Sequence, residues 1–194
     1  MNRRHLLAAA AAALASACTE SKPKFAGVDV TGAPYGKDFN LPDADGKPRA
    51  LAEFKGKLVA LFFGYTQCPD ACPTTMAELA EAKKLLGAQG DQLQVVFVTV
   101  DPARDTAPIL KAYMGNFDAT FLALRPNEQQ LEQVAKDFKV YYKKAEGGDA
   151  KNYTMDHTAS TYVFDMQGRL RLYERYGSGP QVLAADFKKL LDAA

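Results

Sequence analysis

The sequence contains few residues of the kinds that bind metals or carry out redox chemistry. Its 194 residues include three cysteines, two histidines and no tryptophan. So few cysteines exclude a disulfide framework, and a chain of this length buries about 70% of its unfolded surface without one. Basic and acidic side chains nearly balance, at 24 and 23. A chain without an excess of positive charge lacks the surface typical of nucleic-acid binding, so we expect no nucleic-acid partner.

The longest hydrophobic run lies at the N-terminus. Residues 6–15 are apolar and follow two arginines, and the small residues Ala15, Ser16 and Ala17 stand before Cys18. Because this run is too short to cross a bilayer as a mature helix, it predicts an export signal over residues 1–17. The small residues before Cys18 resemble a lipoprotein processing site, which makes Cys18 a candidate lipid anchor on a tether of residues 18–28. We therefore expect an exported protein on the periplasmic side of a bacterial inner membrane. Plain secretory cleavage and twin-arginine export both stay open.

The remaining chain, residues 29–194, alternates apolar runs with helical patterns. Strands are predicted at Leu58 to Phe63 and Leu93 to Val100, helices at Thr74 to Leu86, Thr106 to Asn116, Asn127 to Phe138 and Pro180 to Leu191, and hairpins within Asp38 to Arg49 and Thr161 to Tyr176. The two continuous apolar runs are typical of strands buried on both faces. The order of elements predicts an α/β fold with a thioredoxin-like mixed central sheet flanked by helices and an N-terminal β-hairpin.

A cysteine pair follows the first central strand. Residues 64–73 read GYTQCPDACP, which places Cys68 and Cys72 between a strand and a helix. Since proline is tolerated at the first helical position, we expect the helix to begin at Pro73, with Cys72 at its cap. Amides at a helix start lower the pKa of a nearby thiol, and a thiolate is both a nucleophile and a metal ligand.

Metal binding and disulfide exchange are both compatible with this cysteine pair. His157 is the one histidine outside the predicted export signal, and two sulfurs with one nitrogen suit copper. A structural zinc site needs a fourth ligand, for which Asp70 or Asp156 is a candidate. Disulfide exchange is less favoured, because the usual redox spacing has two residues between the cysteines rather than three. Thioredoxin-like oxidoreductases also carry a cis-proline before the strand at residues 161–165, where this chain has none.

Three segments together resemble the signatures of the SCO/SenC family. They are GYTQCPDACP at 64–73, VDPARDT at 100–106 and DHT at 156–158, and the match extends over roughly residues 39–191. The resemblance implies a copper-binding thioredoxin-like domain that helps assemble the dinuclear copper A centre of cytochrome c oxidase. It implies Cys68, Cys72 and His157 as ligands of Cu(I) and Cu(II).

The same resemblance suggests partners and leaves alternatives. The expected partners are the copper A subunit of the oxidase, a periplasmic copper donor and a thiol reductant. Asp70 and Asp156 are candidates for hydrogen bonds that orient a ligand. We predict a metallochaperone rather than an enzyme. The alternatives are a thiol–disulfide oxidoreductase that reduces the oxidase subunit's cysteines, a thiol peroxidase, and a redox or copper sensor.

Overall fold

The computed structural model describes residues 23–147 and 152–193. The predicted export signal, Cys18 and the first part of the tether lie outside these residues. In chain order the elements are β1 (Val28–Asp29), β2 (Asn40–Pro42), β3 (Pro48–Ala50), the 3-10 helix η1 (Leu51–Phe54), β4 (Leu58–Gly64), α2 (Ala71–Leu85), the 3-10 helix η2 (Gly87–Gln92), β5 (Leu93–Thr99), α3 (Ala107–Gly115), β6 (Leu122–Leu124), α4 (Glu128–Phe138), β7 (Tyr142–Lys144), β8 (Met155–His157), β9 (Thr161–Phe164), β10 (Leu170–Glu174) and α5 (Pro180–Asp192). None of the described helices has the length and apolar character that a bilayer-spanning helix needs.

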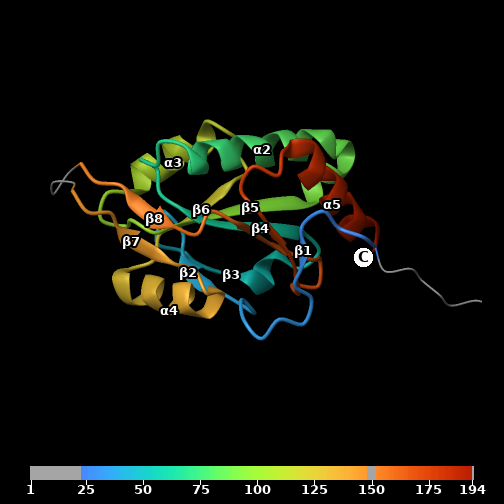
Figure 1. Cartoon of the computed structure of the whole chain (residues 1–194), viewed down its shortest axis with the longest axis horizontal. Coiled ribbons are helices and arrows are strands. Elements are labelled where there is room, and N and C mark those ends of the chain that lie inside the picture. The colour runs from blue at the N-terminus through green and yellow to red at the C-terminus, as the bar shows by residue number, and fades with distance from the viewer. Residues whose placement is uncertain (1–22, 148–151, 194) are drawn as a thin grey trace, which may run out of the picture.

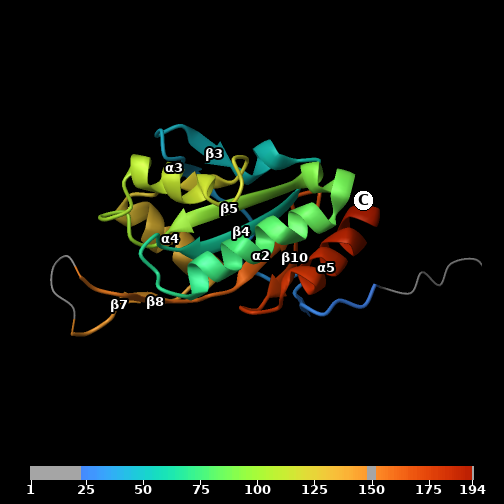
Figure 2. The same cartoon turned by 90° about the horizontal axis from the view of Figure 1, so that it is seen from above.

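A six-stranded mixed sheet forms the centre of the domain. Its strand order is β1-β10-β9-β4-β5-β6, with β4, β5 and β6 parallel and the other neighbours antiparallel. Helices α2, α3 and α5 cover one face, and α4 and the β2–β3 hairpin lie on the other (Figures 1 and 2). Every residue of β4 is buried, as expected for a parallel strand covered on both sides. The predicted fold class and the N-terminal hairpin are confirmed.

The sheet brings two loops to one edge. Because β4 and β5 are parallel, their carboxyl ends lie side by side, and Gly64 pairs with Thr99. The loop after β4, residues 65–70, holds Cys68 and leads into α2, which holds Cys72; we call it the cysteine loop. The loop after β5, residues 100–106, lies beside it. Crevices outside the carboxyl ends of parallel strands are the usual position of functional sites in α/β proteins.

The sequence did not predict the short strands β1, β6, β7 and β8. Strands β7 and β8 pair with each other in a separate two-stranded sheet, which we call the β7–β8 arm. His157 is the last residue of β8 and pairs with Tyr142. The histidine is therefore carried on this arm, which projects at one end of the domain (Figure 1).

Two buried carboxyl groups, one on β10 and one on α5, lie near each other, far along the chain from the cysteine loop. Glu174 is 1% exposed and Asp186 is fully buried. Asp186 accepts hydrogen bonds from the amides of Ala26 and Gly27 at 2.7 and 2.9 Å, and Lys189 pairs with it at 2.6 Å. Burial first, and then the charge of Asp186, raise the pKa of Glu174 to about 7.

We expect Glu174 to make the domain less stable as the pH rises. Its raised pKa means that the folded state holds the proton more tightly than the unfolded chain does. The stabilisation is fully present below the ordinary pKa of 4.5 and is lost as the pH rises through about 7. This shift corresponds to about 3 kcal/mol of the free energy of unfolding.

Urea unfolding of Glu174→Gln at about pH 5 and about pH 8 measures this contribution, because glutamine cannot ionise. The free energy of unfolding should decrease from the lower to the higher pH in the wild type, and this decrease should be much smaller in the variant. Glu132→Gln, on the exposed face of α4, is the matched control and should keep the wild-type profile. An unchanged pH profile in Glu174→Gln would contradict the expectation.

Candidate metal centre

The cysteine loop ends where α2 begins, two residues earlier than the sequence predicted. The helix starts at Ala71 and Asp70 occupies its N-cap position, so Cys72 and Pro73 are its second and third residues. The expectation of Cys72 as the cap was wrong. The first four N–H groups of a helix have no intrahelical partner, so proline is tolerated at the third position as well. The shift places the Cys72 side chain inside the first turn.

The two thiols differ in their surroundings. Cys68 is half-buried, and the Cys72 amide donates to its sulfur at 3.4 Å. A hydrogen bond from the Cys72 thiol, opposed by burial and helped by His157 and the amides of Asp70 and Cys72, lowers the pKa of Cys68 to about 3. Cys72 is fully buried, and burial raises its pKa. The metal-free pair therefore holds a thiolate at Cys68 and a thiol at Cys72.

The imidazole of His157 faces this pair. Its Nε2 lies 3.4 Å from the Cys72 sulfur, and its Nδ1 lies 3.1 Å from the Thr158 carbonyl oxygen. Because a carbonyl only accepts hydrogen bonds, Nδ1 donates to it, and this contact turns Nε2 toward the thiols. The ring stands edge-on to Phe62 and Tyr65, with centroid distances of 6.0 and 5.7 Å.

These side chains form a donor set for one metal ion. The Cys68 sulfur, the Cys72 sulfur and a His157 ring nitrogen all lie within 4.8 Å of one another. Bonds of about 2.0 to 2.3 Å, as zinc makes to imidazole and thiolate, place three donors about 3.5 to 4.0 Å apart in a trigonal arrangement. A metal ion of similar size therefore fits after the donors approach one another by less than about 1 Å. Within the described residues no aspartate joins this cluster, so it does not form a four-ligand structural zinc site.

The other two predicted site residues lie beside the cluster. Asp70, the last residue of the cysteine loop, accepts a hydrogen bond from the Tyr176 hydroxyl at 3.1 Å. Asp156 is exposed and pairs across the arm with Lys143. Adjacent residues of a strand point to opposite faces, so Asp156 points away from the face of His157. The contact that holds the imidazole in the structure comes from the Thr158 carbonyl, and a role of Asp156 in orienting a ligand stays a prediction.

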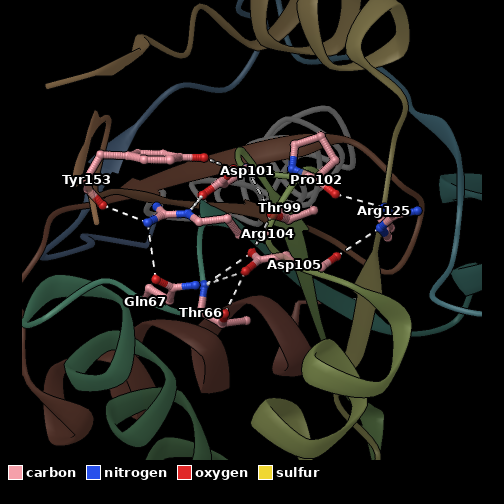
Figure 3. A network of polar contacts seen from close by, with 9 residues as sticks. All are labelled: Thr66, Gln67, Thr99, Asp101, Pro102, Arg104, Asp105, Arg125 and Tyr153. Carbon is pink, nitrogen blue, oxygen red and sulfur yellow. Dashed lines mark hydrogen bonds and ion pairs between the residues drawn. The ribbon is translucent and has the colours of Figure 1, made fainter. Parts of the chain in front are cut away.

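The sequence did not predict that residues 101–106 support the cysteine loop. Figure 3 shows that this segment reaches the cysteine loop through side chains. Asp105 is fully buried and accepts from the Thr66 amide at 3.1 Å and the Thr66 hydroxyl at 2.6 Å. Thr99 donates to the same carboxylate at 2.5 Å. The signal available in the sequence was the acidic residue Asp105 in the loop that follows β5, at the edge of the sheet that also carries the cysteine loop.

Gly64, at the end of β4, provides the space for the Cys72 sulfur. A Cβ atom at this position would lie 2.8 Å from that sulfur and 2.7 Å from Cε1 of Phe62. The Phe62 ring is fully buried and cannot move aside easily. We expect Gly64→Ala to lower the free energy of unfolding by about 1 to 3 kcal/mol and to displace the Cys72 side chain.

Urea unfolding checks the loss of stability, and the reactivity of the thiols checks the displacement. Gly115→Ala is the matched control, since no atom lies within 4 Å of the added Cβ at that helical position. It should be as stable as the wild type or more so. A Gly64→Ala variant with wild-type stability would show that the close approach is unimportant.

The fold and the cluster define a class: a thioredoxin-like domain in which a thiolate, a buried thiol and an imidazole meet at one edge of the sheet. The chain belongs to the SCO1/SenC family, whose model matches residues 28–192. It is 38% identical over 147 residues to an SCO2-like protein of Rickettsia felis, an alignment that covers 75% of this chain and 72% of the relative.

Solved structures of relatives share the fold. Bradyrhizobium japonicum ScoI with copper bound is 38% identical, with a TM-score of 0.73, and the match covers 81% of this chain and 99% of that one. The apo Sco1 protein of Thermus thermophilus is 35% identical, with a TM-score of 0.77, over 88% and 99% of the two chains. The thioredoxin-like fold and the resemblance predicted from the sequence are confirmed.

Proposed function

We propose that this protein binds copper through Cys68, Cys72 and His157 and delivers it to another protein. The observation that carries the proposal is the convergence of two sulfurs and one ring nitrogen within 4.8 Å. Thiolates are soft ligands that favour Cu(I), and imidazole suits copper in either oxidation state. The copper-bound structure of the B. japonicum relative supports the choice of metal.

The accessibility of the cluster suits transfer rather than permanent storage. Cys68 is only half-buried, and Pro69 and Asp70 beside it are exposed. An incoming thiolate or imidazole can therefore reach the metal from the side of Cys68 while Cys72 and His157 still hold it. Three protein ligands leave copper a further position for such a donor group. Copper is thus the cargo of the protein.

The resemblance to the family points to the recipient. We propose the copper A subunit of a cytochrome c oxidase, with the protein exported and held on the periplasmic side of the inner membrane. Copper would come from a periplasmic donor, and a thiol reductant would keep the cysteine pair reduced. A disulfide between Cys68 and Cys72 would leave no thiolate for copper, so copper occupancy would depend on the redox state of the pair.

A transfer assay tests the proposal. Protein loaded with one Cu(I) is mixed with the reduced soluble copper A domain of an oxidase, and the metal content of both is measured after separation. We expect stoichiometric movement of copper to the oxidase domain. Asp156→Ala, which changes an exposed residue beside the cluster, should transfer as the wild type does. Copper that stays on the donor would rule out delivery to this partner.

A second function is favoured by the unequal thiols. Cys68 has a pKa of about 3, so it is the thiolate that would attack a disulfide. Its sulfur would form a mixed disulfide and release one partner thiol, and Cys72, after losing its proton, would displace the other. The partner gains two electrons, and the pair ends as a disulfide. This function predicts that metal-free protein reduces an oxidised copper A domain, with His157→Ala equally active.

A further inference from the structure

The position of His157 depends on how the β7–β8 arm is held. Among the described residues, β7 and β8 form hydrogen-bonded ladders with each other and none with the central sheet. The cysteines, in contrast, follow β4 at the centre of that sheet. The short connection from His157 to β9, which pairs with β4, limits the distance between the imidazole and the thiols, and side-chain contacts between the arm and the rest of the domain limit it further.

Arg104 makes such contacts with three segments at once (Figure 3). Its Nη1 donates to the Gln67 side-chain oxygen at 3.1 Å, on the cysteine loop. The same nitrogen donates to the Tyr153 carbonyl at 2.8 Å, two residues before β8. Its Nε pairs with Asp101 on its own loop. Arg104 thus links the cysteine loop directly to the arm.

Tyr153 completes the connection from the side of the arm. Its ring lies under the guanidinium of Arg104, 3.4 Å from the ring centroid, in a cation–π contact. Its hydroxyl donates to Asp101 at 2.9 Å. The side chains of Arg104 and Asp101 are only 12% and 4% exposed, so water weakens these contacts little.

The loop that carries Arg104 is itself fixed. Arg125 donates to the carbonyls of Asp105 and Pro102 at 2.9 and 2.8 Å. Asp105 in turn holds Thr66 on the cysteine loop. Arg104 therefore lies on a loop that is itself held in place by hydrogen bonds. An arm bound to Arg104 keeps a constant position relative to Cys68 and Cys72.

We propose that Arg104 is a positioning residue that latches the β7–β8 arm to the cysteine loop and so brings His157 to the thiols. Arginine suits this role because its planar fork donates to two acceptors while its face stacks on an aromatic ring, and lysine cannot do both. The latch is a property of the metal-free protein. Its effect on copper rests on the proposed function.

Amide hydrogen exchange of the metal-free protein tests the latch itself. In Arg104→Met we expect the protected amides of β7 and β8 to exchange at least about tenfold faster, while those of β4 and β5 keep their rates. Arg49→Met is the matched control, because Arg49 also faces a ring, that of Phe54 at 5.5 Å, and pairs with Asp43 and Glu53. Wild-type exchange in the arm of Arg104→Met would overturn the proposal.

Copper affinities test the consequence. Arg104→Met should lower the Cu(II) affinity by about tenfold to a hundredfold, the usual effect of losing a residue that orients a ligand. The Cu(I) affinity, which rests on the thiolates, should fall by less than about threefold. Pulsed electron paramagnetic resonance should show weaker nitrogen coupling to Cu(II). Arg104→Lys should behave like Arg104→Met. A lysine variant that keeps the full Cu(II) affinity would show that only the charge of Arg104 matters, and would overturn the latch.

Tyr153→Ala provides the same test if Arg104→Met fails to fold, because it removes the ring and the Asp101 contact from the side of the arm. It should show the same faster exchange and the same selective loss of Cu(II). Wild-type values in both measurements would overturn the latch. A wild-type protein whose Cu(II) shows no nitrogen coupling would overturn the proposed ligand set instead, and hydrogen exchange would still report on the latch.

Discussion

Replacing Cys72 with serine is expected to abolish tight copper binding. A serine hydroxyl stays protonated at neutral pH and is a hard donor, so Cu(I) loses one of its two soft ligands. We expect the Cu(I) affinity to fall on the order of a thousandfold or more, as measured by competition with a Cu(I)-specific chelator. Cys68→Ser should cause a loss of similar size, since the cluster holds one sulfur from each residue.

Met76→Leu is the matched control for Cys72→Ser. Met76 is fully buried one turn further along α2, and its replacement also removes a buried sulfur. Leucine conserves the volume, so stability should change by less than about 1.5 kcal/mol. Copper affinity should not change. A large loss of Cu(I) in Met76→Leu, or tight Cu(I) binding by Cys72→Ser, would show that the sulfur ligands have been assigned wrongly.

Replacing His157 with alanine is expected to separate the two oxidation states of copper. Two thiolates suffice for Cu(I), whereas Cu(II) also requires the borderline imidazole donor. We expect the Cu(II) affinity to fall about a hundredfold and the Cu(I) affinity by less than about tenfold. Chelator competition measures both, and the charge-transfer absorbance of the Cu(II)–thiolate complex should weaken in parallel.

Asp156→Ala controls for disturbance of the arm, because this exposed neighbour on β8 points away from the cluster. It should keep both affinities and the absorbance of the wild type. Equal losses of Cu(I) and Cu(II) in His157→Ala would count against the imidazole as a ligand that distinguishes the oxidation states. A change of the copper affinities in Asp156→Ala would support the role in orienting a ligand that the sequence suggested for this carboxylate.

The central sheet could be predicted from the sequence because its signals are local. Strands β4 and β5 are continuous apolar runs, which burial on both faces requires. The four α-helices among the described residues are each marked in the sequence by a helical pattern and by residues typical of helix ends. The start of α2 was misplaced by two residues because Pro73 at the first helical position is a preference, and proline is acceptable throughout the first turn.

The residues of the candidate metal centre could be predicted from the sequence, but the contacts that hold them in place could not. Its three residues are rare in the chain and lie in recognisable segments. The β7–β8 arm has strands of only three residues, rich in exposed polar side chains, and no apolar periodicity marks it. The contact of Arg104 with Tyr153 joins residues 49 positions apart, and nothing near either residue in the sequence signals it.

X-ray absorption spectroscopy of the protein loaded with one equivalent of copper tests the ligand set most directly. The proposed ligand set predicts two sulfur scatterers and one nitrogen scatterer of imidazole type around each copper ion in the oxidised form. The imidazole contribution should disappear in His157→Ala and persist in Asp156→Ala. A copper ion with a single sulfur neighbour, or with an imidazole signal that survives His157→Ala, would contradict it.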